Sequence, residues 1–139
     1  MSKYAIAKWQ GNGKEGKGEI STESKALDNS SFTFATRFGT AKEGTNPEEL
    51  IAAAHAGCYT MKLSFVLNEA GYTADNLETK CDIDFADGQV TSSHLTVTGN
   101  VPGISKEKFE ECANNAKDNC PISKSLSDSI KITVDASLA

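Results

Sequence analysis

The chain has 139 residues, of which 38% are hydrophobic and 24% charged, and its formal net charge is −5. These values are typical of a globular chain large enough to bury a core, and we expect a single domain over residues 1–139. The acidic balance and the scattered lysines argue against a nucleic-acid surface, because such surfaces concentrate positive charge. The N-terminus lacks the apolar run of a signal peptide, and no apolar stretch reaches about 18 residues. We therefore expect a cytoplasmic protein with no membrane partner, whose cysteines are thiols.

The N-terminal part of the chain predicts three antiparallel strands. Three segments alternate between apolar and polar residues and are separated by a glycine-rich turn and a polar loop: residues 3–10, 18–21 and 31–38. The first two segments predict a β-hairpin, and the third predicts a strand that ends just before a loop. Arg37 would lie near the end of this third strand.

The stretch of residues 46–67 predicts one long helix of about 23 residues that stops at Gly71, and we expect the rest of the chain to be organised around it. Asn46 can cap the first turn, and Pro47 suits the first helical position because its missing N–H would have no partner there. Residues 50–59 are mostly small and apolar. We therefore expect this helix to be buried on most sides, with Cys58 near its middle.

The C-terminal half predicts more strands and a second helix. Three segments have the pattern of strands: residues 76–85, 90–101 and 130–134. Between the last two, Ser105 is expected to cap a helix that ends at Cys120-Pro121, and residues 124–126 predict a loop or a short turn. Together the segments predict an α+β fold with N-terminal antiparallel strands, a long central helix, and C-terminal strands with a second helix.

Four cysteines are candidates for chemistry, and none pairs at the C-x-x-C spacing typical of zinc or thioredoxin-like sites. We expect no metal and no cofactor. Cys81 on a strand and Cys112 on a helix stripe are interpreted as small buried hydrophobes. Cys58 among small neighbours and Cys120 at a helix exit, where a thiol can move, fit a redox pair or two idle thiols equally well. His55, one turn before Cys58, is interpreted as a packed or hydrogen-bonded side chain.

Arg37 is the single arginine among fourteen basic residues. Its permanent charge and planar fork of donors can bind a carboxylate at two points and lower the pKa of a nearby thiol. The alternative interpretation is a surface charge in a lysine-rich chain.

Two segments carry a specific pattern: GTNPEELIAAAHAGC at residues 44–58 and NCPIS at residues 119–123. In these segments, and over nearly the whole chain, the sequence resembles the OsmC/Ohr family of thiol peroxidases. Residues 9–24 and 34–38 resemble its osmotically inducible (OsmC) branch. Cys81 and Cys112 lie outside the family motif, and the position of His55 is also compatible with small or aromatic residues.

The resemblance implies a peroxidatic Cys58, a resolving Cys120, and an Arg37–Glu48 pair that poises the thiolate. Cys58 would reduce organic hydroperoxides, and hydrogen peroxide less well, to give a sulfenic acid that condenses with Cys120. A cellular dithiol would then reduce the resulting disulfide. The resemblance also implies an intertwined homodimer with two sites at its interface.

A shared site also fits the helix geometry. Glu48 and Cys58 are ten residues apart, which places them about 15 Å apart along one straight helix and excludes direct contact. We therefore expect Arg37 to reach Cys58 of the partner subunit. Two other classes stay open: a module that binds a small apolar ligand while its thiols stay idle, and a structural stress protein whose dimer is its function.

Overall fold

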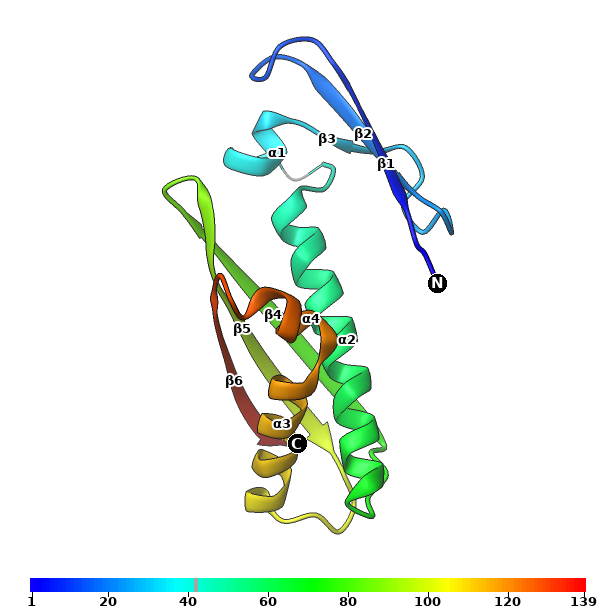
Figure 1. Cartoon of the computed structure of the whole chain (residues 1–139), viewed down its shortest axis with the longest axis vertical. Coiled ribbons are helices and arrows are strands. Elements are labelled where there is room, and N and C mark those ends of the chain that lie inside the picture. The colour runs from blue at the N-terminus through cyan, green and yellow to red at the C-terminus, as the bar shows by residue number, and fades with distance from the viewer. Residues whose placement is uncertain (42) are drawn as a thin grey trace. The chain divides into compact units, whose positions relative to one another are not determined.

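The computed structural model describes residues 1–41 and 43–139, and the chain divides into two compact units, Met1–Leu50 and Ile51–Ala139 (Figure 1). Each unit has a three-stranded sheet of its own. The expected single domain over residues 1–139 stays a prediction.

The N-terminal unit contains the predicted hairpin and a third, short strand: β1 (Ala5–Gln10), β2 (Lys17–Thr22) and β3 (Ser30–Phe32). They pair antiparallel in the order β1-β2-β3. The hairpin turn needs glycine at position 16, because a β-carbon there would lie 2.4 Å from the carbonyl oxygen of Asn12. The prediction of a β-hairpin is confirmed.

The predicted strand over residues 31–38 is wrong beyond Phe32, because Phe34–Phe38 form the short helix α1. Thr33 caps this helix in a reciprocal arrangement with Thr36. The backbone N–H of Thr36 donates to the Thr33 hydroxyl at 3.2 Å, and the N–H of Thr33 donates to the Thr36 hydroxyl at 2.8 Å. These bonds satisfy first-turn donors locally, so the segment leaves the sheet. Arg37 therefore lies in the last turn of a helix and not on a strand.

The long helix α2 spans Pro47–Glu69, as predicted. Its N-terminus is capped by Asn46, whose side-chain oxygen accepts from the N–H of Glu49 at 2.7 Å. Gly71 follows the C-terminus with a φ of +92°, a left-handed conformation that glycine adopts without a steric penalty. Capping residues at both ends thus define the helix.

The expectation that α2 is buried on most sides is wrong for the single chain. One face packs in the core, where Tyr59, Leu63 and Leu67 are 0% exposed. On the other face, Met61 and Phe65 remain 64% and 58% exposed. By length and composition alone α2 could also cross a membrane. Because its buried face belongs to a hydrophobic core, we interpret α2 as a core helix.

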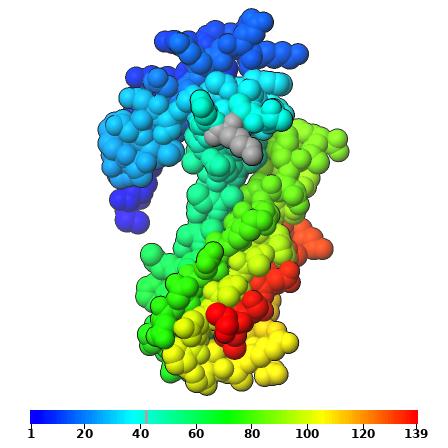
Figure 2. All heavy atoms as spheres, turned by 180° about the vertical axis from the view of Figure 1, so that it is seen from behind, coloured from blue at the N-terminus to red at the C-terminus, as the bar shows by residue number. Residues whose placement is uncertain are grey.

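The C-terminal unit contains three strands and two further helices in addition to most of α2: β4 (Asn76–Ala86), β5 (Gln89–Asn100), α3 (Lys106–Asn119), α4 (Pro121–Leu126) and β6 (Lys131–Leu138). The sheet order is β4-β5-β6, with β4 antiparallel and β6 parallel to β5. Its core combines side chains from α2, α3 and β5. Seen from behind, the strands lie at the molecular surface (Figure 2), so the helices cover only one face of the sheet.

Most predicted elements of this unit are confirmed, including the cap of α3, where the N–H of Lys108 donates to the Ser105 hydroxyl at 3.1 Å. Two expectations are wrong. Residues 124–126 belong to helix α4 and not to a loop or short turn. Pro121, which follows the end of α3, is also the first residue of α4. The last strand runs to Leu138, four residues beyond the predicted end.

Candidate active site

The thiols of Cys58 and Cys120 lie in contact inside the C-terminal unit. Their sulfur atoms are 3.2 Å apart, and both cysteines are free. Cys58 is half-buried on α2, and Cys120 is 0% exposed. Because a disulfide bond is about 2.05 Å long, a shift of about 1 Å would join the two sulfurs. The two candidate redox cysteines are therefore placed for disulfide formation.

Cys120 lies at the junction between α3 and α4, where its backbone is hydrogen-bonded to both helices. Its N–H donates to the carbonyl of Ala116 at 2.9 Å, and its own carbonyl accepts from the N–H of Lys124 at 3.0 Å. Pro121 begins α4 at a position where its missing N–H is no loss. The backbone around the thiol is therefore fixed from both sides, which keeps the sulfur close to Cys58.

Burial raises the pKa of the Cys58 thiol, because desolvation disfavours the thiolate. Two groups oppose this effect: the backbone N–H of Ile122, which hydrogen-bonds the sulfur, and the positive charge of Lys62. The neighbouring Cys120 raises the pKa further, and the net change is upward. A further positive group near the sulfur would lower the pKa of Cys58 and favour the thiolate.

A buried hydrogen-bond network surrounds His55, one turn before Cys58. The Nδ1 atom of His55 lies 2.6 Å from the hydroxyl of Ser93, and its Nε2 atom lies 2.8 Å from the hydroxyl of Ser123. Burial lowers the pKa of His55. A lowered pKa favours the neutral ring, in which one nitrogen donates and the other accepts. The interpretation of His55 as a hydrogen-bonded side chain is confirmed.

The other two cysteines occupy different surroundings. Cys112 is buried in the core, as expected for a structural thiol. Cys81 is half-buried, and its sulfur lies 3.2 Å from the Ser93 hydroxyl and 3.9 Å from Nδ1 of His55. Burial raises the pKa of both thiols. In the described residues, 1–41 and 43–139, no three His, Cys, Asp or Glu side chains are grouped to hold a metal ion.

Arg37 and Glu48 form the expected ion pair within the N-terminal unit. Nε of Arg37 donates to Glu48 Oε1 at 3.0 Å, and Nη2 donates to the same oxygen at 2.8 Å. Helix α1 supplies the arginine and the first turn of α2 supplies the glutamate. The side chain of Asn46 links the two helices by donating to the carbonyl of Thr36 at 3.0 Å. The guanidinium therefore has a fixed orientation.

An aromatic pocket of about 120 Å³ lies beside this ion pair in the same unit. Its lining includes Arg37 and four aromatic residues: Trp9, Phe32, Phe34 and Phe38. The rings of Phe34 and Phe38 are 5.0 Å apart, and the guanidinium lies 5.1 Å from the centre of the Phe38 ring. Such a pocket suits a small apolar group attached to a polar one.

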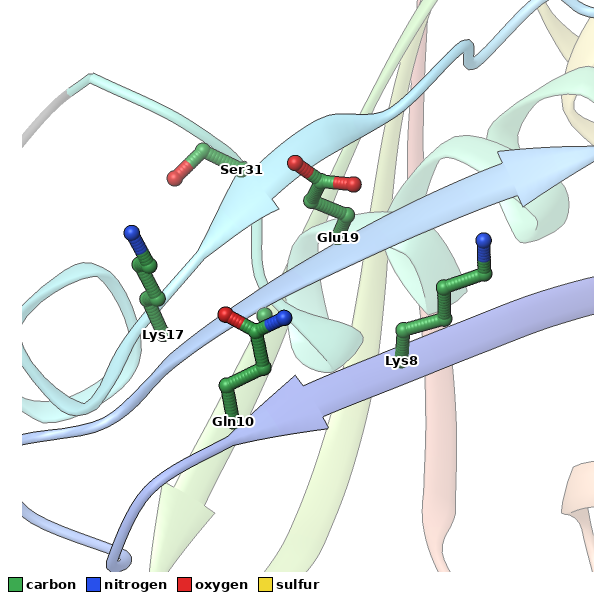
Figure 3. A pocket seen from close by; sticks show the side chains of 6 residues that line it. Lys8, Gln10, Lys17, Glu19 and Ser31 are labelled. Atoms are coloured by element: carbon green, nitrogen blue, oxygen red, sulfur yellow. The ribbon is translucent and has the colours of Figure 1, made fainter.

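A second hollow, of about 210 Å³, lies on one face of the N-terminal sheet (Figure 3). The side chains that line it are polar and come from all three strands: Lys8, Gln10, Lys17, Glu19 and Ser31. It contains no thiol and is not a candidate for redox chemistry.

The four predicted site residues thus come together as two pairs, Arg37 with Glu48 and Cys58 with Cys120, each within one unit. Two hydroxyl residues at the site, Ser93 and Ser123, were not predicted. No local sequence pattern indicates that these serines contact His55, because they lie 38 and 68 residues from it along the chain.

Comparisons with known proteins show close relatives. The model of the OsmC-like protein family matches residues 39–135. The chain is 42% identical to peroxiredoxin OsmC of Escherichia coli (strain K12), over 99% of this chain and 97% of that protein. It is 30% identical to the organic hydroperoxide resistance protein OhrB of Bacillus subtilis (strain 168), over 66% of this chain and 69% of that protein.

Solved structures show the same fold. The crystal structure of OhrB of Bacillus subtilis matches with a TM-score of 0.72 at 24% identity, covering 96% of this chain and 97% of that one. The crystal structure of an OsmC-like protein from Mycoplasma pneumoniae matches with a TM-score of 0.78 at 15% identity, covering 100% and 98%. The predicted α+β fold is confirmed.

Proposed function

Because this chain belongs to the OsmC family, we propose that it is a thiol-dependent peroxidase that reduces organic hydroperoxides, and hydrogen peroxide less well. The observation that carries the proposal is the 3.2 Å contact between the sulfur atoms of Cys58 and Cys120. Two thiols in contact can supply the two electrons that reduction of a peroxide requires, with a disulfide as the product.

The reaction has three steps. The thiolate of Cys58 attacks the distal oxygen of ROOH, the O–O bond breaks, and the alkoxide takes up a proton and leaves as the alcohol. This step oxidises Cys58 to a sulfenic acid. The thiolate of Cys120 then attacks the sulfenic sulfur, water leaves, and a Cys58–Cys120 disulfide forms. A cellular dithiol reduces this disulfide by exchange and restores both thiols.

Arg37 supplies a second positive group for Cys58, in addition to Lys62 of the same unit as Cys58. Its hydrogen bonds to Glu48 fix the direction of the guanidinium. A guanidinium beside the sulfur lowers the pKa of the thiol and opposes the effect of burial. We place this contact across a homodimer, so that each site combines Cys58 of one chain with the Arg37–Glu48 pair of the other.

The aromatic pocket beside Arg37 would hold the apolar group of an organic hydroperoxide and direct its polar end toward the guanidinium. The pocket favours organic peroxides over hydrogen peroxide, because only the former bury apolar surface in it. A reducing compartment is required to regenerate the thiols, which supports a cytoplasmic location.

Variants of the two cysteines test this mechanism. After one equivalent of cumene hydroperoxide, the wild type is expected to lose two thiols and to contain a Cys58–Cys120 disulfide. Cys120→Ser should stop at a sulfenic acid on Cys58, because the resolving thiol is missing, and Cys58→Ser should not react. Mass spectrometry of peptides after trapping with dimedone distinguishes these products. Cys112→Ser is the matched control, with wild-type turnover expected.

An intact Cys58 thiol in the peroxide-treated Cys120→Ser protein would overturn the assignment. A module that only binds a small apolar ligand in the aromatic pocket would keep all its thiols under the same treatment. Steady-state rates with cumene hydroperoxide and with hydrogen peroxide, each under several dithiols, would then identify the preferred substrate and reductant.

A further inference from the structure

His55 links three elements of the C-terminal unit from a fully buried position. It lies on α2, and its two ring nitrogens contact Ser93 on β5 and Ser123 on α4. His55 and Ser93 are 0% exposed and Ser123 is 3% exposed. The imidazole therefore bridges two buried hydroxyl groups, whose burial costs free energy unless they are hydrogen-bonded.

The contact between His55 and Ser123 runs beside the contact between the two thiols. His55 precedes Cys58 by three residues on α2, and Ser123 follows Cys120 by three residues. The same two segments are therefore joined twice, by a hydrogen bond of 2.8 Å and by a sulfur–sulfur contact of 3.2 Å. Ile122, whose backbone N–H hydrogen-bonds the Cys58 sulfur, lies between the two links.

Helix α4 depends on such a link. It has only six residues, and no side chain caps its N-terminus. A helix of this length is not stable by itself, because it forms few internal hydrogen bonds for the backbone entropy it loses. The orientation of its first turn must therefore come from tertiary contacts. The buried hydrogen bond between His55 and Ser123 is such a contact.

We propose that His55 is a positioning residue of the redox centre: through the Ser123 hydroxyl it holds the first turn of α4, and so keeps Cys120 and the N–H of Ile122 against Cys58. His55 does not touch the peroxide. Its effect on catalysis rests on the proposed function, but its effect on the two thiols is independent of any peroxide.

Two serine variants separate this role from a general contribution to stability. Ser123→Ala removes the bond from His55 to α4, whereas Ser93→Ala removes the bond to β5 and leaves α4 attached. Both changes delete one buried hydroxyl that contacts the same ring, so they are matched in size and burial. A chemical unfolding curve for each variant gives its loss of stability and shows that it is folded.

The readouts are alkylation of each cysteine against pH, resolved by peptide mass spectrometry, and the rate at which diamide oxidises the Cys58–Cys120 pair to the disulfide. Ser123→Ala is expected to raise the pKa of Cys58 and to slow disulfide formation about tenfold, because misplaced reacting groups lose rate steeply. Ser93→Ala is expected to leave the pKa of Cys58 and the rate of disulfide formation unchanged. It should instead raise the pKa of Cys81, because the Ser93 hydroxyl contacts the Cys81 sulfur.

Equal effects of the two variants on Cys58, or no effect of Ser123→Ala on either readout, would overturn the proposal. Neither measurement uses a peroxide. If the wild type fails to reduce peroxides but Ser123→Ala still changes the reactivity of Cys58, the proposed function is wrong and the positioning role stands.

Discussion

The reactivity of Cys58 is set by a competition between burial and positive charge at one sulfur atom. Burial and the neighbouring Cys120 raise its pKa, the N–H of Ile122 and the charge of Lys62 lower it, and the net change is upward. The group that decides the outcome must combine a permanent charge with a fixed position. Arg37 has both, because Glu48 holds it by more than one hydrogen bond.

Replacing Arg37 with lysine tests whether the shape of the guanidinium matters as well as its charge. Lysine keeps the charge but cannot bind Glu48 and the thiolate at the same time through a planar fork. We expect Arg37→Lys to raise the pKa of Cys58 and to slow the reaction with cumene hydroperoxide about tenfold or more. The rate of alkylation of Cys58 against pH reports the pKa directly.

Lys62→Gln is a useful comparison, because it removes a charge from the helix that carries Cys58 and should produce a smaller rise of the same pKa. A pH profile of alkylation that Arg37→Lys leaves unchanged would return Arg37 to the role of a surface charge.

At the level of elements, the sequence predicts those whose ends carry local signals. The bounds of α2 follow from Asn46 and Pro47 at one end and Gly71 beyond the other, and these residues act through bonds to their immediate neighbours. Helix α1 was missed because the alternation of its aromatic residues also fits a strand. The capping box of Thr33 and Thr36 is the signal that distinguishes the two, since it satisfies backbone donors without a neighbouring strand.

The site could be predicted only in part for a related reason. The positions of Cys58 and Cys120 on a long helix and at a helix junction mark them as unusual cysteines within the sequence itself. The roles of Ser93 and Ser123 depend on tertiary contacts of a single buried ring. The parallel pairing of β6 with β5 is likewise a product of the crossover through α3, which local patterns do not encode.

Gly99 on β5 is a packing requirement of the second unit. A β-carbon at this position would lie 2.7 Å from the ring of Phe109 on α3, which is buried. We expect Gly99→Ala to lower the free energy of unfolding by about 1–3 kcal/mol, because the helix or the ring must move away from the sheet. Denaturant titration measures this change.

Gly13→Ala is the matched control for Gly99→Ala, since a β-carbon at Gly13 meets no atom within 4 Å. It should change the free energy of unfolding by no more than about 0.5 kcal/mol. Equal stability of the two variants would show that β5 and α3 are not packed as closely as described.

At the scale of the whole molecule, the exposed face of α2 is the candidate interface of the proposed homodimer. Met61 and Phe65 are one turn apart, large, apolar and mostly exposed, and Gly57, one turn earlier, is exposed too. Exposed apolar patches of this kind mark interaction surfaces in soluble proteins. An interface along α2 would run close to Cys58, so a dimer formed there would place its catalytic thiol beside residues of the partner.

The test of a shared site is complementation between two damaged chains. Cys58→Ser lacks the nucleophile and Arg37→Ala lacks the guanidinium, so we expect each protein alone to have little activity. The two are unfolded together and refolded as a mixture, and heterodimers are identified by a mass tag on one chain. Each variant taken through the same procedure alone is the control.

If Arg37 acts across the interface, the heterodimer contains one complete site, formed by Cys58 of the Arg37→Ala chain and Arg37 of the Cys58→Ser chain. Its other site lacks both groups, so the heterodimer should recover about half of the wild-type activity, because one of two sites works. If Arg37 acts within its own chain, every site in the mixture lacks one group and no activity returns. Heterodimers that form without activity would therefore place Arg37 and Cys58 of each site in the same chain.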